Sequence, residues 1–198
     1  MPRFLSEDRI RDLITKRTPW IESKLKEQSE KYILKPNKYI NGEVFSYIGK
    51  DYRLKVITGD RVSIKMKNGY LVAIILDTVA EQEQEQIKPL LEDWYQSHAE
   101  VLLKEKIKRF TKVIGVTPKS VSVKNYKSRW GSCSNRGEIS FNWRIILAPH
   151  RIIDYVVVHE LCHLLEHNHS SRYWKLVEQH VPDWRDCRDW LKNKDLVI

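Results

Sequence analysis

The stretch Val156–Trp174, "VVVHELCHLLEHNHSSRYW", decides how this chain is interpreted. It holds four of the chain's seven histidines and begins with an apolar run. In a helix, His159 and His163 stand four positions apart, so their side chains project from one face, one turn above the other. Glu160 follows the first histidine, and from there its carboxylate can lean over an ion without binding it. The pattern H-E-x-x-H therefore predicts a metal site with an adjacent general base.

A catalytic zinc site needs a third protein ligand and one open position for water. If the helix continued straight, His167 would lie about 12 Å along the axis from His159, too far for one ion to bind both. Asn168 tolerates a left-handed cap conformation, which would end the helix and turn His169 back toward the metal. The sequence therefore predicts that the three zinc ligands are His159, His163 and His169. His167 is expected to be their neighbour.

Other interpretations of the cluster stay open. Glu178 or His180 on the following helix is also a candidate third ligand, because some zinc sites take a downstream glutamate. Cys162 points away from the histidine face, so we expect it to be a small core residue. If the cluster were only polar helix surface, the apolar segment 152–165 would bury two histidines and a glutamate without a ligand, which is costly.

Composition limits the class of protein. The 198 residues, 41% of them hydrophobic, are enough to bury one substantial core. The three cysteines form no C-x-x-C pair and cannot all be paired, so we expect free thiols in a reducing compartment and a cytoplasmic location. No segment has signal-peptide character or approaches the roughly 18 apolar residues of a membrane span. The net charge of +9 would steer an anionic partner such as a nucleic acid or a nucleotide, but interspersed acidic residues are typical of solvated helix faces.

In the N-terminal part of the chain, the spacing of apolar residues changes once, from helical spacing to alternation. Residues 7–31 have apolar side chains at helical spacing after the candidate cap Ser6, and Pro19 is expected to kink or split that helix. Residues 43–76 alternate apolar and polar side chains and contain the hairpin signal Asn68-Gly69. This pattern predicts an antiparallel meander.

Helical and extended patterns alternate in the remainder. A long helix is expected over residues 81–114, closed by Gly115, and two strands are expected around the segment "GSCSNRG". The order of elements favours an α+β fold. Further helices are expected over residues 149–167, 171–180 and 183–192, the second of them capped by Ser170 or Ser171. We expect an N-terminal helix and meander over residues 1–80 and a metal-binding hydrolase domain over residues 81–198, packed as one unit.

The motifs R-W-G-S-C, N-W-R, H-E-L-C-H and N-H-S lie within residues 127–177, and this segment resembles the YgjP-like zinc metallohydrolases, which are grouped with SprT-like metallopeptidases. The resemblance runs from about Val121 to Trp190. Two N-terminal segments also resemble the family: "PRFLSEDRIRDLITKRTPWI" and "YIGKDYRL". It implies a zincin-like fold with an antiparallel or mixed sheet and an active-site helix. It also implies zinc bound by His159, His163 and His169, with Glu160 as the base. Family members usually begin with a further β-rich segment, so either the start is truncated or this branch lacks those strands.

In zincins, the strand before the active-site helix lies along the cleft and can pair with an extended substrate. The segment 138–147 has that place here. A tryptophan in a strand is also common in the hydrophobic core, so burial in the core is the alternative role of the tryptophans named next. The cleft candidates are Trp130, Asn142 and Trp143; the candidates for oxyanion stabilisation are Arg129, Tyr173 and His180; and the candidates for orienting a ligating histidine are Asp154, Asp183 and Asp186.

The leading functional prediction is a metallopeptidase. Zinc, or another divalent metal, would lower the pKa of its water, Glu160 would remove the proton, and hydroxide would attack a polarised carbonyl. The same chemistry suits a phosphoanhydride hydrolase, such as a nucleoside triphosphate pyrophosphatase acting on UTP, because a basic protein favours a nucleotide. A third class is a non-catalytic zinc domain or a nucleic-acid-associated module. Such a site would be closed by a fourth Cys or His, and Glu160 would have no role.

Overall fold

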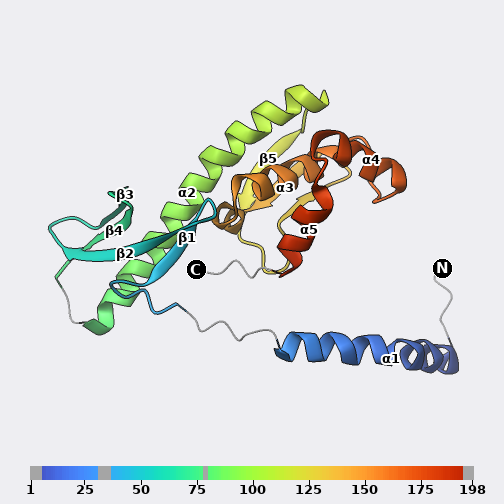
Figure 1. The fold of residues 1–198 in the computed structure, drawn as a ribbon, viewed down its shortest axis with the longest axis horizontal. Coiled ribbons are helices and arrows are strands. Elements are labelled where there is room, and N and C mark those ends of the chain that lie inside the picture. Colours follow the sequence, from blue (N-terminus) through green and yellow to red (C-terminus); the bar gives the residue numbers. More distant parts are fainter. Residues whose placement is uncertain (1–5, 31–36, 78–79, 194–198) are drawn as a thin grey trace. The chain divides into compact units, whose positions relative to one another are not determined.

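The computed structural model describes residues 6–30, 37–77 and 80–193, and the chain divides into two units, Met1–Pro36 and Asn37–Ile198. The first unit contains helix α1, Glu7–Glu30 (Figure 1). A kink or a split was predicted at Pro19, and the split is wrong: the helix continues through this residue, because it can lose one backbone hydrogen bond to a proline and continue on both sides. The kink stays a prediction. The predicted last residue of this helix, Lys31, lies outside the described residues.

The second unit begins with a mixed sheet of four strands in the order β1-β2-β4-β3. The predicted antiparallel meander is wrong, because β4 runs parallel to β2 and separates it from β3. β4 is an almost continuous buried apolar run, which favours a central position, whereas β3 carries alternating lysines and suits an edge. The predicted hairpin is confirmed, since Asn68 and Gly69 both have positive φ between β3 and β4. The strands are β1 (Val44–Tyr47), β2 (Lys50–Thr58), β3 (Ser63–Lys67) and β4 (Tyr70–Ile75).

Helix α2 (Ala80–Ile114) connects the two halves of this unit (Figure 1). It contacts β3 and β4 of the first sheet, and it also contacts helix α3 and strand β5 of the second half. Its buried face includes Leu91 and Tyr95, and the Tyr95 hydroxyl donates to the Ser46 carbonyl at 2.7 Å. The predicted end of the helix is confirmed, because Gly115 follows it with a φ of 77°. The expected domain boundary near residue 80 stays a prediction.

A second sheet precedes the histidine helix. It has three strands in the order β5-β7-β6, with β5 parallel and β6 antiparallel to β7. The prediction of two strands is wrong because "GSC" looks like a turn by composition, yet it pairs with residues 139–141 as a short strand. The α+β class is confirmed. The elements are β5 (Ser120–Lys124), β6 (Gly131–Cys133), β7 (Glu138–Asn142) and the 3-10 helix η1 (Trp143–Leu147).

Three helices complete the unit: α3 (His150–Cys162), α4 (Ser171–His180) and α5 (Trp184–Asn193). α3 is the central one, because it contacts α2, α4, α5 and β6. The predicted cap of α4 is confirmed at Ser170, whose hydroxyl accepts from the Tyr173 backbone amide at 3.2 Å.

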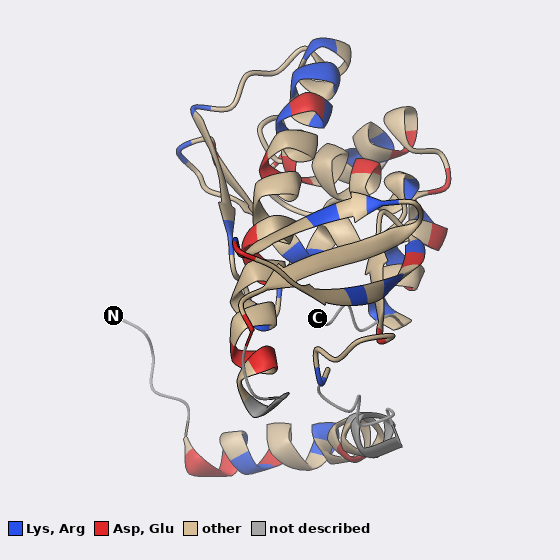
Figure 2. Ribbon diagram, turned by 90° about the vertical axis from the view of Figure 1, so that its left-hand side faces the viewer, with Lys and Arg blue, Asp and Glu red and all other residues tan. Residues whose placement is uncertain are grey.

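The distribution of charge matches solvated helix faces. Figure 2 shows Lys and Arg interspersed with Asp and Glu along the helices. None of the helices in the described ranges combines the length and the apolar character that crossing a membrane requires.

Candidate metal centre and active site

Helix α3 presents the metal motif from the middle of the core. Nine of its residues are buried, among them Val156, Val157 and Val158 on the approach to His159. This apolar burial fixes the helix, so the side chains of its last turn have defined positions.

α3 ends earlier than the sequence pattern predicts. Its last residue is Cys162, and His163 is the C-cap, with right-handed backbone angles. The predicted left-handed cap at Asn168 is wrong, because that residue is not among those with positive φ. Instead, the amides of Leu165 and Glu166 both donate to the Cys162 carbonyl at 3.1 Å, which closes the helix with a tight turn. The chain is thereby free to reverse direction over residues 166–170.

The reversal brings three of the predicted histidines together. The ring centroids of His159 and His163 are 5.0 Å apart, and those of His159 and His169 are 5.1 Å apart. The Nε2 atoms of His159 and His169 are separated by 3.2 Å. One ligand atom from each of the three residues lies within 4.8 Å of the others.

These nitrogens fit a divalent ion. Tetrahedral zinc with Zn–N bonds of about 2.0–2.1 Å places its ligand nitrogens about 3.3 Å apart, close to the separation of the His159 and His169 Nε2 atoms. The Nδ1 atom of His163 lies 3.1 Å from the Glu166 carbonyl. If Nδ1–H donates to that oxygen, the Nε2 lone pair is left for a metal.

The histidines are also held in the neutral form that metal binding requires. Burial, together with the neighbouring charges of His163 and His169, lowers the pKa of His159 to about 3. Burial lowers the pKa of His163, although its hydrogen bond to Glu166 opposes this, and burial also lowers the pKa of His169.

Aromatic side chains of α4 hold the imidazole rings. Tyr173 stacks on His163 with centroids 4.5 Å apart, and Trp174 stacks on His169 at 5.4 Å. The Tyr173 hydroxyl donates to the His159 carbonyl at 3.0 Å, which satisfies an acceptor in the last turn of α3. The cluster therefore forms one packed unit.

Glu160 is buried beside strand β6. A Cβ atom added at Gly131 would lie 2.6 Å from the Glu160 Oε1 atom and 2.7 Å from its Cγ, so only glycine leaves room for this carboxylate. Burial raises the pKa of Glu160 to about 8, and the charge of Arg129 opposes the rise. A carboxyl group with a pKa near neutral is suited to taking up and returning a proton.

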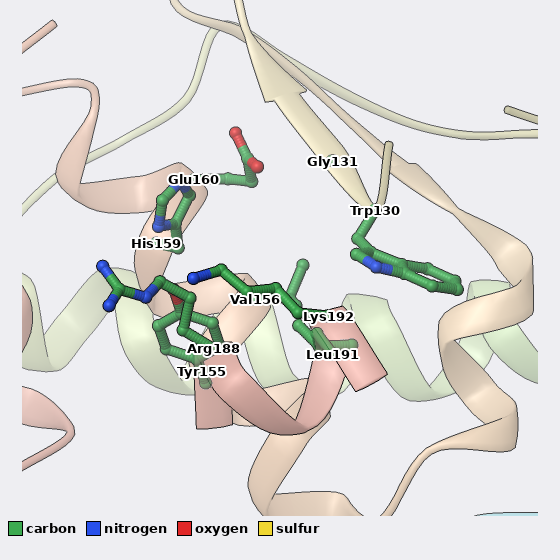
Figure 3. A pocket seen from close by; sticks show the side chains of 9 residues that line it. All are labelled: Trp130, Gly131, Tyr155, Val156, His159, Glu160, Arg188, Leu191 and Lys192. Carbon is green, nitrogen blue, oxygen red and sulfur yellow. The ribbon is translucent and has the colours of Figure 1, made fainter. Parts of the chain in front are cut away.

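Two hollows meet at this carboxylate. One, of about 250 Å³, is lined by the three clustered histidines together with His167 and Cys133. The other, of about 280 Å³, is lined by residues of α3, α5 and the start of β6 (Figure 3). His159, Glu160 and Gly131 line both hollows.

The structure brings only some of the other candidates to the site. Trp130 lines the second hollow, and the charge of Arg129 reaches Glu160. Asn142 and Trp143 are buried away from both hollows, which makes them core residues; the Asn142 amide donates to the backbone carbonyls of Tyr126 and Arg129. β7 cannot pair with a substrate as expected, because β5 and β6 occupy its two edges.

The remaining candidates have structural partners. The Tyr173 hydroxyl is engaged by the His159 carbonyl and lines neither hollow. Asp154 pairs with Lys106 at 2.5 Å, and Asp183 pairs with Arg151 at 3.0 Å. The hydrogen-bond contacts of the three histidines within the described residues involve no carboxylate side chain. The Nδ1 atom of His159 is buried without a partner among these residues, and that of His163 lies against the Glu166 carbonyl. The alternative third ligands Glu178 and His180 are not members of the metal-binding group. His180, the candidate for oxyanion stabilisation, and Asp186, a candidate for orienting a histidine, line neither hollow.

Sequence reasoning missed the close contact at Gly131 and the contribution of α5. Gly131 carried a signal, because a glycine in the R-W-G-S-C segment permits close approach by another group. Arg188 and Lys192 reach the second hollow from α5, and their spacing of four on an amphipathic helix places them on one face.

A helix bearing H-E-x-x-H, a third histidine beyond its end and a buried glutamate within an α+β fold define a metal-dependent hydrolase. The model of the family "YgjP-like, metallopeptidase domain" matches residues 1–194, and the chain belongs to this family. Such a domain implies a catalytic metal.

Two solved structures are similar to this chain. The metallopeptidase zymogen abylysin of Pyrococcus abyssi is 20% identical, with 48% of this chain and 99% of that chain covered and a TM-score of 0.40. The metallopeptidase zymogen jannalysin of Methanocaldococcus jannaschii is 15% identical, with 46% and 95% covered and a TM-score of 0.40. Among proteins of curated function, none matches this chain.

Proposed function

We propose that this protein is a zinc-dependent peptidase in which Glu160 is the general base. The observation that carries the proposal is the meeting of three neutral imidazoles and one buried carboxylate at a shared hollow. Membership of a metallopeptidase family agrees with it.

His159, His163 and His169 would hold the ion through their Nε2 atoms. Bound zinc would supply Lewis acidity, which lowers the pKa of water and polarises a carbonyl. The stacking of Tyr173 and Trp174 limits rotation of the imidazole rings, so the ligand set is organised before the ion arrives.

Glu160 would move the proton. Its carboxylate accepts a proton from the attacking water and then returns it to the leaving amine, which must depart as a neutral group. Burial keeps the proton affinity of this carboxylate high, and Arg129 limits the rise of its pKa. Because Gly131 has no side chain, the carboxylate can lie against β6 and still border the histidine hollow.

The edge of β6 is the proposed guide for a peptide. Among the described strands, only β7 pairs with β6, and the first residue of β6, Gly131, lines both hollows. An extended peptide added along the other edge would pass across Glu160, with main-chain hydrogen bonds fixing its register. The three free cysteines agree with a reducing compartment, so we propose a cytoplasmic location.

The test is a comparison of substrate classes. Zinc-loaded protein is incubated with a casein digest and, separately, with UTP, and products are identified by mass spectrometry. We expect metal-dependent cleavage of peptides that stops with a chelator and returns with added zinc. Release of pyrophosphate from UTP without peptide cleavage would assign the site to phosphoanhydride hydrolysis instead.

A further inference from the structure

The second hollow is placed to receive part of a substrate. Its volume is about 280 Å³, and it shares His159, Glu160 and Gly131 with the histidine hollow. Pockets that hold whole small molecules measure about 300–1,000 Å³, so this cavity suits a single side chain or a chain terminus. A group bound there would lie next to the proposed base.

The lining combines an apolar wall with two cations. Trp130, Val156 and Leu191 supply apolar surface, and α5 adds Arg188 and Lys192. Figure 3 shows the nitrogen-bearing ends of Arg188 and Lys192 extending toward the side where His159 lies, with the Trp130 indole on the other side. The Glu160 carboxylate points away from both cations in the same view.

Arg188 is held in place but keeps donors free. Its guanidinium carbon lies 5.0 Å from the ring centre of Trp184 and 5.7 Å from that of Trp174, so cation–π contacts fix its plane. Its Nε atom is buried and has no hydrogen-bond partner among the described residues. A guanidinium has five N–H donors, and most of those of Arg188 are uncommitted.

One carboxylate, that of Asp189, forms ion pairs with both Arg188 and Lys192. Asp189 Oδ1 lies 3.7 Å from Arg188 Nε and 3.4 Å from Lys192 Nζ, and Asp189 does not line the cavity. Asp189 partly compensates both cations from outside the cavity. The lining itself holds these two cations and one acidic residue, Glu160, whose carboxylate points away from both of them (Figure 3), so the side formed by α5 is positively charged. An arginine fork with an ammonium group beside it matches the two oxygens of a carboxylate.

We propose that this cavity binds a carboxylate of the substrate peptide, with Arg188 as its principal anchor and Lys192 as a second contact. The carboxylate belongs to an acidic side chain or to the free C-terminus, and the apolar wall receives the methylene groups that carry it. The proposal rests on the proposed peptidase function and names its substrate class.

Matched peptides test the assignment by turnover. Peptide pairs that differ only by Glu against Gln at one position, each with a free or an amidated C-terminus, are digested by the zinc-loaded protein. We expect the carboxylate to raise kcat/KM by about tenfold or more, as for a charged hydrogen bond, and the amidated arm identifies its source. Arg188→Gln should abolish the preference by lowering kcat/KM for the carboxylate peptide toward that for its neutral partner. Lys192→Gln, an exposed change that is less disruptive to packing, should reduce it.

Arg185→Gln is the matched control, because Arg185 lies on the same helix and over the same Trp184 ring but does not line the cavity. This variant should keep the full preference. Equal turnover of all four peptides by the wild-type protein, whether they carry Glu or Gln and a free or an amidated C-terminus, would overturn the assignment and leave the peptidase function standing. A carboxylate preference that survives in both Arg188→Gln and Lys192→Gln would do the same.

A binding measurement separates the two proposals. Zinc-loaded Glu160→Gln protein is titrated calorimetrically with the same peptides. If Glu peptides bind more tightly and Arg188→Gln removes the difference while the wild-type protein cleaves no peptide, the cavity assignment stands and the peptidase function fails. If neither the Glu side chain nor the free C-terminus tightens binding, or if only phosphate-bearing ligands such as UTP bind, the cavity assignment fails.

Discussion

Gly131 and Glu160 are so closely packed that a methyl group on Gly131 would lie 2.6 Å from the Glu160 Oε1 atom. The glycine of β6 therefore determines where the proposed base can lie. Strand and helix are far apart in the sequence, and their contact positions a carboxylate that borders both hollows.

Gly131→Ala is expected to reduce kcat without loss of the metal. The added methyl must displace the Glu160 side chain, and a misplacement of about 1 Å can cost about 100-fold in rate. Zinc content should be unchanged, because the three atoms nearest to the added methyl all belong to Glu160. Steady-state kinetics and metal analysis of the purified variant check this. Wild-type kcat in the zinc-loaded variant would show that Gly131 does not position the base.

His169→Ala and His167→Ala should differ in zinc affinity. Both residues line the histidine hollow, but only His169 belongs to the group of converging nitrogens. Loss of a direct ligand should exceed the roughly 10–100-fold cost typical of an outer partner, whereas His167→Ala should bind nearly as tightly as the wild type. Competition with a chromophoric chelator measures both. Weak binding by His167→Ala alone would make that residue the third ligand.

The stability of the metal-free protein should depend on pH through two opposite shifts. The pKa of Glu160 is raised from 4.5 to about 8, so the unfolded chain releases its proton first and stability falls as pH rises across that interval. The pKa of His159 is lowered from 6.5 to about 3, so stability falls as pH drops across that lower interval.

Glu160→Gln isolates the first of these effects. Each pKa unit is worth about 1.4 kcal/mol, so wild-type protein in chelator should lose several degrees of melting temperature between about pH 5 and pH 8 relative to this variant. The fall at acid pH should persist in both proteins, because His159 is unchanged. Parallel melting curves for the two proteins throughout this range would contradict the raised pKa of Glu160.

The sequence was informative where the structure depends on local geometry. The spacing of His159, Glu160 and His163 follows from the period of one helix, and the Asn68-Gly69 hairpin follows from the backbone preferences of two residues. The chain turns back toward His169 as expected, but the predicted cause of the turn was wrong. The helix ends in a tight turn at Cys162, and Asn168 does not adopt a left-handed conformation.

Features that depend on long-range packing were not predicted. The apolar run of β4 favours a central place in the sheet, but it does not specify that β4 lies between β2 and β3 and runs parallel to β2. Trp143 was a cleft candidate because it was expected within the strand of residues 138–147, but β7 ends at Asn142 and Trp143 stacks on Tyr95 of α2 in the core. Arg188 reaches the site only because α5 packs against α3, and no local pattern specifies that contact.

The most direct test of the account is a single variant, Glu160→Gln, assayed for zinc content and for peptide turnover on the same preparation. Its amide has the shape of the carboxylate but cannot accept the proton of the attacking water. We expect zinc at the wild-type level and a loss of kcat of at least about 100-fold, the lower range for removal of a general base. Wild-type turnover by the zinc-loaded variant would contradict the assignment of Glu160 as the base.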